Sequence, residues 1–315
     1  MGPPRRVATS VRVQLHNAKG WTHRARARLV AAESADKRFA RYHRLGDDQW
    51  HQVVLDSING HSALPMPGFP AADLQAGFVG SSNRRAIDEG WAFYTLVTEE
   101  RRRSGLPLGR DAHVLDFGCG WGRYARMFLR DVPENHIWCA DTWDLALQTC
   151  REASVPGPKV LLPQMPPSDL PADRFDLVVA YSVFSHLSPD AHAAWSKEFA
   201  RVVRPGGLAF VTTQARWFLD DCKELRDRPE KVSTVWQEHL ASSFVDHAGS
   251  LDLYDRGSFL FAPTGGAGQE GAFYGEAVVP RAVFEEVWGG HFDVVDFVED
   301  RARCPQAVAI LRRRG

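Results

Sequence analysis

One strand–turn–helix unit, at residues 113–128, limits what this 315-residue chain can fold into more than any other stretch. Residues 113–117 form a short, mostly apolar strand pattern that carries an acid close to its end. Three glycines at alternate positions follow, Gly118, Gly120 and Gly122, and a helical pattern begins at Tyr124. A strand, a glycine-rich turn and a helix form the opening unit of nucleotide-binding α/β folds.

The turn departs from the dinucleotide-binding pattern in two ways. That pattern has its third glycine three residues after the second, whereas here Arg123 stands at that position and Gly122 comes one residue early. The acid, Asp116, lies beside the expected ligand site, where a carboxylate would repel a pyrophosphate but attract ammonium and sulfonium charges. The sequence therefore favours a ligand with positive charges over a dinucleotide.

Strand and helix patterns alternate beyond this unit. Apolar strand patterns recur at residues 136–140, 160–162, 176–180 and 208–213. Between the last two strands, Trp195, Phe199 and Val202 mark the inward stripe of a helix. Such alternation predicts an α/β fold with a doubly wound, mostly parallel sheet and helices on both faces.

Two closing strands complete the expected sheet. Residues 292–298 and 306–311 are apolar strand patterns joined by a short link, which favours an antiparallel pair and brings the sheet to seven strands. Pro280 is expected to open the helix before them.

A match to a known family rests on several motifs in order. The stretch from Asp116 to Gly122 resembles motif I of the class I S-adenosylmethionine (SAM)-dependent methyltransferases, and Asp141 matches their motif II. Residues 175–187 resemble the motif IV region, and residues 204–207 resemble the turn before their fifth strand. A weaker match covers residues 274–277 and the closing strands.

This resemblance implies the Rossmann-like methyltransferase fold, SAM as cofactor and S-adenosyl-L-homocysteine as product. It implies methyl transfer to a small-molecule acceptor, with an oxygen of a sugar or secondary metabolite favoured because this version of the family is common among bacterial enzymes of that kind. Transfer to nitrogen or carbon, an RNA methyltransferase and a non-catalytic SAM-binding domain are the alternatives.

The resemblance places the cofactor on a defined set of residues. The three loop glycines and Cys119 allow close backbone approach, Asp116 holds the methionine ammonium, and Asp141 accepts the ribose hydroxyls unless it only caps the next helix. Further residues are expected to contact the cofactor: Thr142, Trp143, Asp169, Tyr181, Ser182 and Phe78. For Trp143 and Phe78 core packing is the competing interpretation, and for Asp169 it is a solvated loop.

His186 is the candidate catalytic residue. It follows the fourth strand just past its carboxyl end, where ligands of doubly wound sheets bind. A histidine there can remove the proton of an acceptor hydroxyl, although it can also simply pack against the next helix. Tyr181 is expected to position the acceptor. No spacing of acids or cysteines predicts a metal site.

Charge is unevenly distributed along the chain. Residues 1–44 carry 11 Lys/Arg and 2 Asp/Glu, whereas the remaining residues carry 27 and 37. The basic segment can be a nucleic-acid arm, but a solvated helical face on an acidic body is the favoured interpretation. Nucleic acid is therefore not expected as a partner, and the oligomeric state stays open.

The five cysteines show no CxxC pair, which favours reduced thiols in a cytoplasmic protein over disulfides or zinc. No apolar run approaches the roughly 20 residues of a membrane span, and the first residues do not resemble a secretory signal.

Four regions are expected. Residues 1–75 form a basic helical extension and linker, with a helix at about 21–42 and no long regular structure in 46–75. Residues 76–213 form the SAM-binding core, in which a helix follows the cap signal at residues 81–83. Residues 214–276 are too long for a plain connection and form an inserted cap over the substrate. Residues 277–315 close the core.

Overall fold

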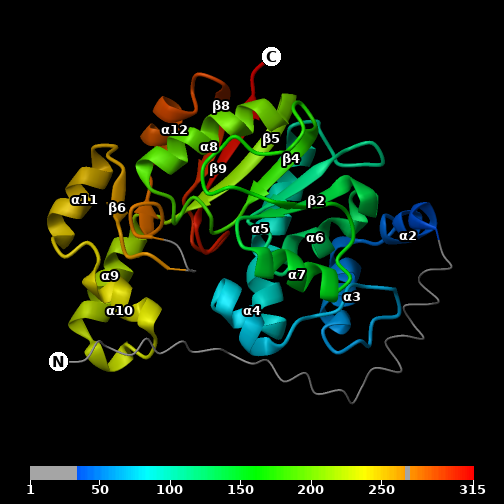
Figure 1. Ribbon diagram of the computed structural model, residues 1–315, viewed down its shortest axis with the longest axis horizontal. Helices are drawn as coiled ribbons and strands as arrows, with labels where there is room; N and C mark the ends of the chain where they lie inside the picture. Colours follow the sequence, from blue (N-terminus) through cyan, green and yellow to red (C-terminus); the bar gives the residue numbers. More distant parts are fainter. Residues whose placement is uncertain (1–33, 267–269) are drawn as a thin grey trace, which may run out of the picture. The chain divides into compact units, whose positions relative to one another are not determined.

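A seven-stranded sheet is the centre of the computed structural model, which describes residues 34–266 and 270–315 (Figure 1). Its strands run in the order β3-β2-β1-β4-β5-β9-β8. β1 to β5 are parallel, and β9 lies antiparallel to both of its neighbours. The strands are β1 (Val114–Phe117), β2 (Ile137–Asp141), β3 (Lys159–Leu161), β4 (Phe175–Ala180), β5 (Val203–Thr213), β8 (Phe292–Val298) and β9 (Ala307–Arg313). The predicted fold class and the antiparallel closing pair are confirmed.

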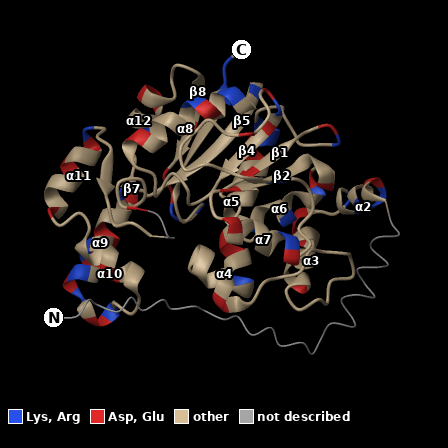
Figure 2. Ribbon diagram, viewed as in Figure 1, with Lys and Arg blue, Asp and Glu red and all other residues tan. Residues whose placement is uncertain are grey.

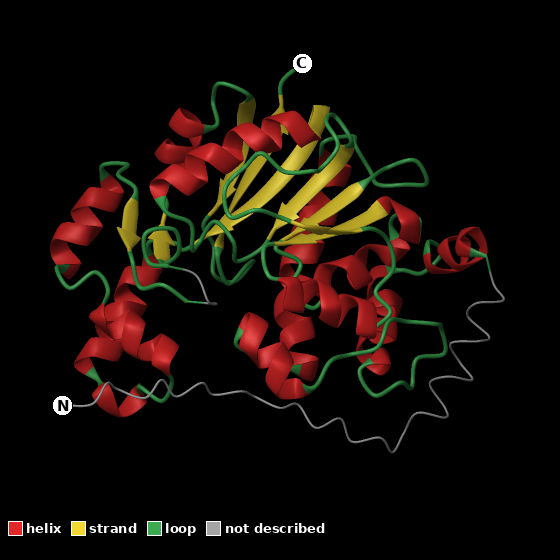
Figure 3. Ribbon diagram, in the orientation of Figure 1, coloured by secondary structure: helices red, strands yellow, loops and turns green. Residues whose placement is uncertain are grey.

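Helices cover both faces of the sheet (Figure 3). α5 (Asn83–Arg103), α6 (Arg123–Met127) and α7 (Asp144–Glu152) share one apolar core, and α8 (Pro189–Val202) and α12 (Arg281–Val287) share the other. Because side chains alternate along a strand, Val114 of β1 enters the first core while Leu115 and Phe117 enter the second.

The start of the described chain is more helical than its sequence suggests. α2 (Ala35–Tyr42) is the described part of the helix expected at 21–42; the rest of that prediction lies outside the described residues. The prediction that 46–75 lacks long regular structure is wrong, because α3 spans Asp47–Ser57. Its buried Trp50 and Val54 are four residues apart on one face, and the glycine and prolines that suggested a linker lie after its end. α4 (Ala72–Val79) follows them.

Two elements differ in extent from their sequence patterns. α5 begins at Asn83 with Ser82 as its N-cap, as expected, and continues to Arg103. β5 begins five residues before the expected Leu208, because Val203 already pairs with Phe175 and a register shift follows at the glycine turn.

Residues between β5 and β7 (Glu276–Val278) fold into α9 (Trp217–Asp227), α10 (Val235–Ser242), α11 (His247–Asp255) and β6 (Leu260–Ala262). β6 pairs antiparallel with β7. They have a small core of their own, which includes Phe218, Leu240 and Tyr254. This segment corresponds to the expected cap, and its role over the substrate stays a prediction. None of the described helices combines the length and the apolarity that a membrane span requires.

The strand order fixes where a ligand would bind. The chain runs outward from β1 through β2 to β3, then returns to the other side of β1 at β4. At such a reversal the loops that follow two neighbouring strands separate and leave a crevice at their carboxyl ends. The residues that follow β1 and β4 are therefore the candidates for the site.

Candidate functional site

The glycine loop that follows β1 is held in one backbone conformation. Gly118, Gly120 and Gly122 have φ values of 72°, 51° and 75°, which favour glycine. The amides of Gly118 and Cys119 both donate to the carbonyl of Ala140 on β2, at 2.8 and 3.1 Å. The loop is thereby fastened to the end of the neighbouring strand.

Gly118 also brings the loops after β1 and β4 into contact. A Cβ at this position would overlap the Cγ2 methyl of Val183. Any side chain here would therefore push apart the two loops that the strand order brings to the site.

Replacing Gly118 with Ala is expected to destabilise the protein by about 2 to 4 kcal/mol, because left-handed strain adds to the overlap with Val183. Thermal unfolding checks this value. In the double variant Gly118→Ala/Val183→Ala the overlap disappears, so part of the loss should be recovered, with Val183→Ala alone as the control. Strict additivity of the two single changes would contradict the contact.

Asp141 joins the end of β2 to the glycine loop. One of its carboxylate oxygens accepts the Gly120 amide and the other accepts the Trp143 amide, each at 2.9 Å. Burial raises the pKa of Asp141 to about 6. Each oxygen keeps a second lone pair, so the carboxylate can still accept two hydroxyl groups.

Two aromatic rings flank this carboxylate. The rings of Phe78 on α4 and Trp143 are 5.0 Å apart at 56°. Phe78 also lies 3.5 Å from the position of a Cβ on Gly120. Trp143 is 37% exposed, so part of this residue is open to solvent. With Thr142 between Asp141 and Trp143, the structure brings these candidates together around the loop.

Asp116 lies deeper than the loop. Its side chain is 1% exposed, and one oxygen accepts the Ala125 amide at 3.0 Å, so it fastens the start of α6. Burial raises the pKa of this carboxyl to about 8. The contact with a cofactor ammonium stays a prediction, and the contact that the structure gives Asp116 is with the helix.

Tyr181 and Asp169 lie in different surroundings. The Tyr181 ring packs against Phe93 of α5 and Tyr124 of α6, each about 5 Å away, so it faces the helical layer.

Asp169 is exposed in the loop before β4. The neighbouring residue, Ser168, is hydrogen-bonded to Glu198 near the end of α8. The structure therefore does not bring Asp169 to the carboxyl ends of β1 and β4.

His186 is held by its ring nitrogens. Nδ1 lies 2.8 Å from the carbonyl of Gly275, and Nε2 lies 3.4 Å from Oγ of Ser182. The ring stacks on Tyr274 at 4.8 Å and 10° and is 13% exposed. Since a carbonyl can only accept, Nδ1 carries the hydrogen and Nε2 of the neutral ring has a lone pair.

A chain of hydrogen bonds supports the same tautomer from the other side. The Ser182 amide donates to Oγ1 of Thr212 at 2.7 Å, and the Thr212 hydroxyl donates to Oε1 of Gln306 at 2.5 Å. The Gln306 amide then donates to Oγ of Ser182 at 3.1 Å. With the Gln306 amide placed this way, the Ser182 hydroxyl accepts from it and can direct its own hydrogen toward Nε2 of His186, at a distance of 3.4 Å.

Sequence reasoning missed the acid beside His186. Glu276 is 2% exposed; one of its oxygens accepts the indole N–H of Trp236 at 3.0 Å. The other lies 3.7 Å from Nδ1 of His186 and has no hydrogen-bond partner among the described residues. Backbone pairing holds Glu276 beside His186, because the amides of its two neighbours, Gly275 and Ala277, donate to the carbonyls of His186 and Ser185. Only the weak motif at 274–277 marked this stretch.

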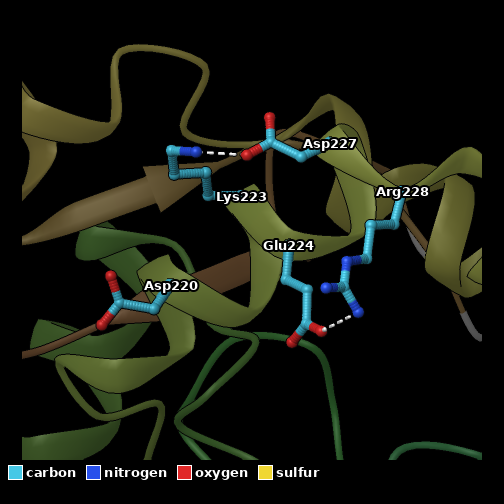
Figure 4. A pocket seen from close by; sticks show the side chains of 5 residues that line it. All are labelled: Asp220, Lys223, Glu224, Asp227 and Arg228. Carbon is cyan, nitrogen blue, oxygen red and sulfur yellow. Dashed lines mark hydrogen bonds and ion pairs between the residues drawn. The ribbon is translucent and has the colours of Figure 1, made fainter.

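A cavity with a charged lining lies on α9, away from the loops that follow β1 and β4. This cavity of about 270 Å³ is lined by side chains of α9 and the residue after it, among which Lys223 pairs with Asp227 and Arg228 pairs with Glu224 (Figure 4). The lining residues are Asp220, Lys223, Glu224, Asp227 and Arg228. They come from a single helical segment, so the cavity does not join the loops that follow β1 and β4.

Charge on the described helices gives little support to a nucleic-acid arm. Basic and acidic residues are interspersed along α9, whereas α10 and α11 carry acidic residues and no Lys or Arg (Figure 2). In the described end of the basic segment, Arg38 is paired with Glu134. Residues 1–33, which hold most of that segment, lie outside the described residues.

Comparison with known proteins identifies the central part of the chain. Residues 114–207 match the family model described as a methyltransferase domain. The chain is 26% identical to trans-aconitate 2-methyltransferase of Azoarcus sp. (strain BH72) over 214 residues, which are 64% of this chain and 72% of the relative. It is 31% identical to thiocyanate methyltransferase 1 of Brassica oleracea over 116 residues, 36% of this chain and 49% of the relative.

Among solved structures, the chain is similar to the 1,6-didemethyltoxoflavin-N1-methyltransferase of Burkholderia thailandensis, crystallised with its acceptor and S-adenosylhomocysteine. The identity is 18%, the coverage is 78% of this chain and 92% of that chain, and the TM-score is 0.41.

Proposed function

We propose that this chain, whose residues 114–207 match a methyltransferase domain, is a class I SAM-dependent enzyme that transfers the methyl group of SAM to a hydroxyl oxygen of a small molecule such as a sugar or secondary metabolite. The observation that carries the choice of a hydroxyl is the contact of Nδ1 of His186 with the Gly275 carbonyl, which makes Nε2 the proton acceptor of the ring.

The loop region fits the cofactor. Asp141 keeps one free lone pair on each oxygen for the ribose hydroxyls, and Gly120 leaves the backbone open beside it. The partly exposed Trp143 is the proposed contact for the adenine, and Phe78 of α4 packs beside it and next to Gly120. When bound, SAM supplies a methyl group already activated by its sulfonium.

The residues after β4 act on the acceptor. A hydroxyl placed beside Nε2 of His186 loses its proton to that nitrogen as the oxygen becomes a nucleophile. The imidazolium that forms keeps its Nδ1 hydrogen on the Gly275 carbonyl and lies 3.7 Å from the Glu276 carboxylate, which stabilises the new charge. Alignment of acceptor and methyl group supplies much of the remaining rate enhancement.

An acceptor that is already anionic has no need of such a base, so the built-in acceptor nitrogen favours a neutral hydroxyl. A relative named for trans-aconitate supports an acceptor of small-molecule size.

Two measurements test the proposed function. Isothermal titration should give a Kd of about 1 to 100 micromolar for SAM and for S-adenosylhomocysteine; absence of binding by both would refute the cofactor assignment. Release of S-adenosylhomocysteine should then be screened against hydroxylated small molecules, with their O-methylated forms as blocked controls. Turnover of the blocked forms would place the methyl group on another atom.

Replacing Glu276 with Gln is expected to lower kcat about 10- to 100-fold while the Kd for SAM stays within about threefold, because the imidazolium loses its nearby negative charge. Single-turnover and steady-state kinetics check this. Glu276→Asp should restore part of kcat.

Trp236→Phe is the matched control for this change, because it removes only the indole donor to Glu276. A similar loss of kcat in Trp236→Phe would mean that Glu276 holds the α10 segment rather than positioning and stabilising His186.

A further inference from the structure

Three cysteine thiols meet beneath the glycine loop, although the sequence spacing predicts no metal site. Cys119 of the loop, Cys139 of β2 and Cys150 of α7 have ligand atoms that all lie within 4.8 Å of one another. All three are buried and free of disulfides. Because 20 and 11 residues separate them along the chain, only the fold unites them.

The spacing of these thiols suits a thiophilic ion. A tetrahedral zinc site with Zn–S bonds of about 2.3 Å places its sulfurs about 3.8 Å apart, so the thiols need to approach one another by less than about 1 Å per pair. The Gly120 carbonyl oxygen lies 3.3 Å from Sγ of Cys150 and 3.8 Å from Sγ of Cys119. This backbone oxygen, near two of the three sulfurs, is a candidate fourth ligand.

A buried cation lies next to the cluster. Arg126 is 0% exposed, and within the ranges 34–266 and 270–315 no carboxylate forms an ion pair with it. Its guanidinium donates to backbone carbonyls, including those of Gly122 and Trp121, and stacks between the rings of Trp121 and Phe69 at 4.6 and 4.3 Å. These contacts solvate the guanidinium but leave its positive charge unbalanced.

The cysteines of the cluster lie near two cations. Arg126 interacts electrostatically with Cys139 and Cys150. The ammonium of Lys159, held by three backbone carbonyls, acts on Cys150 from another side. The thiolate is the form of cysteine that binds metals, and a bound divalent cation displaces the thiol protons.

We propose that Cys119, Cys139 and Cys150 form a structural site for one thiophilic divalent cation of the zinc type. Binding forms three metal–sulfur bonds and releases three protons to solvent, so M²⁺ and three thiols give an M(SR)₃⁻ centre next to Arg126. The ion joins the glycine loop, β2 and α7 at one point and holds the loop against the strand beneath it.

The full-length protein, purified in reductant and treated with a chelator, provides the test. Titration with Zn²⁺ against a chromophoric chelator should show one ion per chain, and Cd²⁺ should give one equivalent of thiolate-to-metal charge-transfer absorption. Cys139→Ser and Cys150→Ser should each weaken Zn²⁺ binding at least about 100-fold. Cys222→Ser and Cys304→Ser are matched controls, since these buried thiols lie outside the cluster, and should leave it unchanged.

A second measurement uses the unmodified chain, so that a variant that fails to fold does not decide the outcome. Zn²⁺ should slow alkylation of Cys119, Cys139 and Cys150 at least tenfold in peptide mass spectrometry and leave Cys222 and Cys304 unaffected. Absence of stoichiometric Zn²⁺ and Cd²⁺ binding, or protection that does not distinguish the two groups of cysteines, would overturn the site. Neither readout depends on methyl transfer.

Discussion

Replacing His186 with Gln is expected to lower kcat about 100- to 10,000-fold, the range that a positioned general base contributes, while the Kd for SAM changes by less than about threefold. The reason is that Nε2 is the ring nitrogen of His186 that can take a proton, since Nδ1 carries its hydrogen toward the Gly275 carbonyl and the Ser182 hydroxyl lies 3.4 Å from Nε2. Gln retains polarity and approximate length but cannot take a proton at neutral pH.

Saturating steady-state kinetics and calorimetric titration with SAM separate the two effects. His291→Gln is the matched control, because it makes the same substitution at an exposed histidine next to β8. If His186→Gln weakens SAM binding as much as it lowers kcat, His186 is a packing residue and the base lies elsewhere.

Replacing Asp141 with Asn is expected to raise the Kd for SAM about 10- to 100-fold and to leave kcat at saturating SAM nearly unchanged. A hydrogen bond to a charged group contributes about 1.5 to 3 kcal/mol, and the amide of Asn can supply only one of the two acceptors that Gly120 and Trp143 use. Asp144→Asn is the control, since Asp144 is exposed at the start of α7. Equal effects of the two changes would argue against a ribose contact.

The same carboxylate makes SAM binding dependent on pH. Burial raises the pKa of Asp141 to about 6. Because the ribose hydroxyls donate to the ionised carboxylate, the affinity for SAM should fall as the pH drops through about 6. Well below that pH, the fall in affinity should approach tenfold per pH unit. In Asp141→Asn this dependence should vanish; calorimetry between pH 5 and pH 8 in the variant and the unmodified protein measures it.

The stability of the free protein should respond in the opposite direction. Because the pKa of Asp141 in the folded chain lies above the ordinary value of 3.8, its contribution to stability is full below pH 3.8 and is lost as pH rises through about 6. A ligand that selects the ionised carboxylate therefore opposes the preference of the free fold.

The sequence predicts the parts of this molecule that depend on local patterns. The ordered strands, the reversal that follows from their alternation, and the positions of the glycine loop, Asp141 and His186 at strand ends all come from short stretches read in order. The family match adds the cofactor, and residues 114–207 match a methyltransferase domain.

Contacts between distant stretches could not be predicted in this way. Glu276 reaches His186 only because the chain returns after about 60 residues and pairs with the loop that follows β4. The thiol cluster combines a turn, a strand and a helix, and none of its spacings resembles a metal motif. α3 was missed because its apolar face is short and the turn-forming residues after it dominated the pattern.

The returning segment has a consequence for engineering. Gln214, just after β5, forms a parallel bridge with Val278, so the chain leaves the core and re-enters it at adjacent points. The intervening α9-to-β6 segment can therefore be exchanged as a cassette between these two points while the seven strands keep their register. Transplanting it from a related enzyme, with residues 273–278 retained to keep Glu276 against His186, would test whether this segment selects the acceptor while the His186–Glu276 contact is kept.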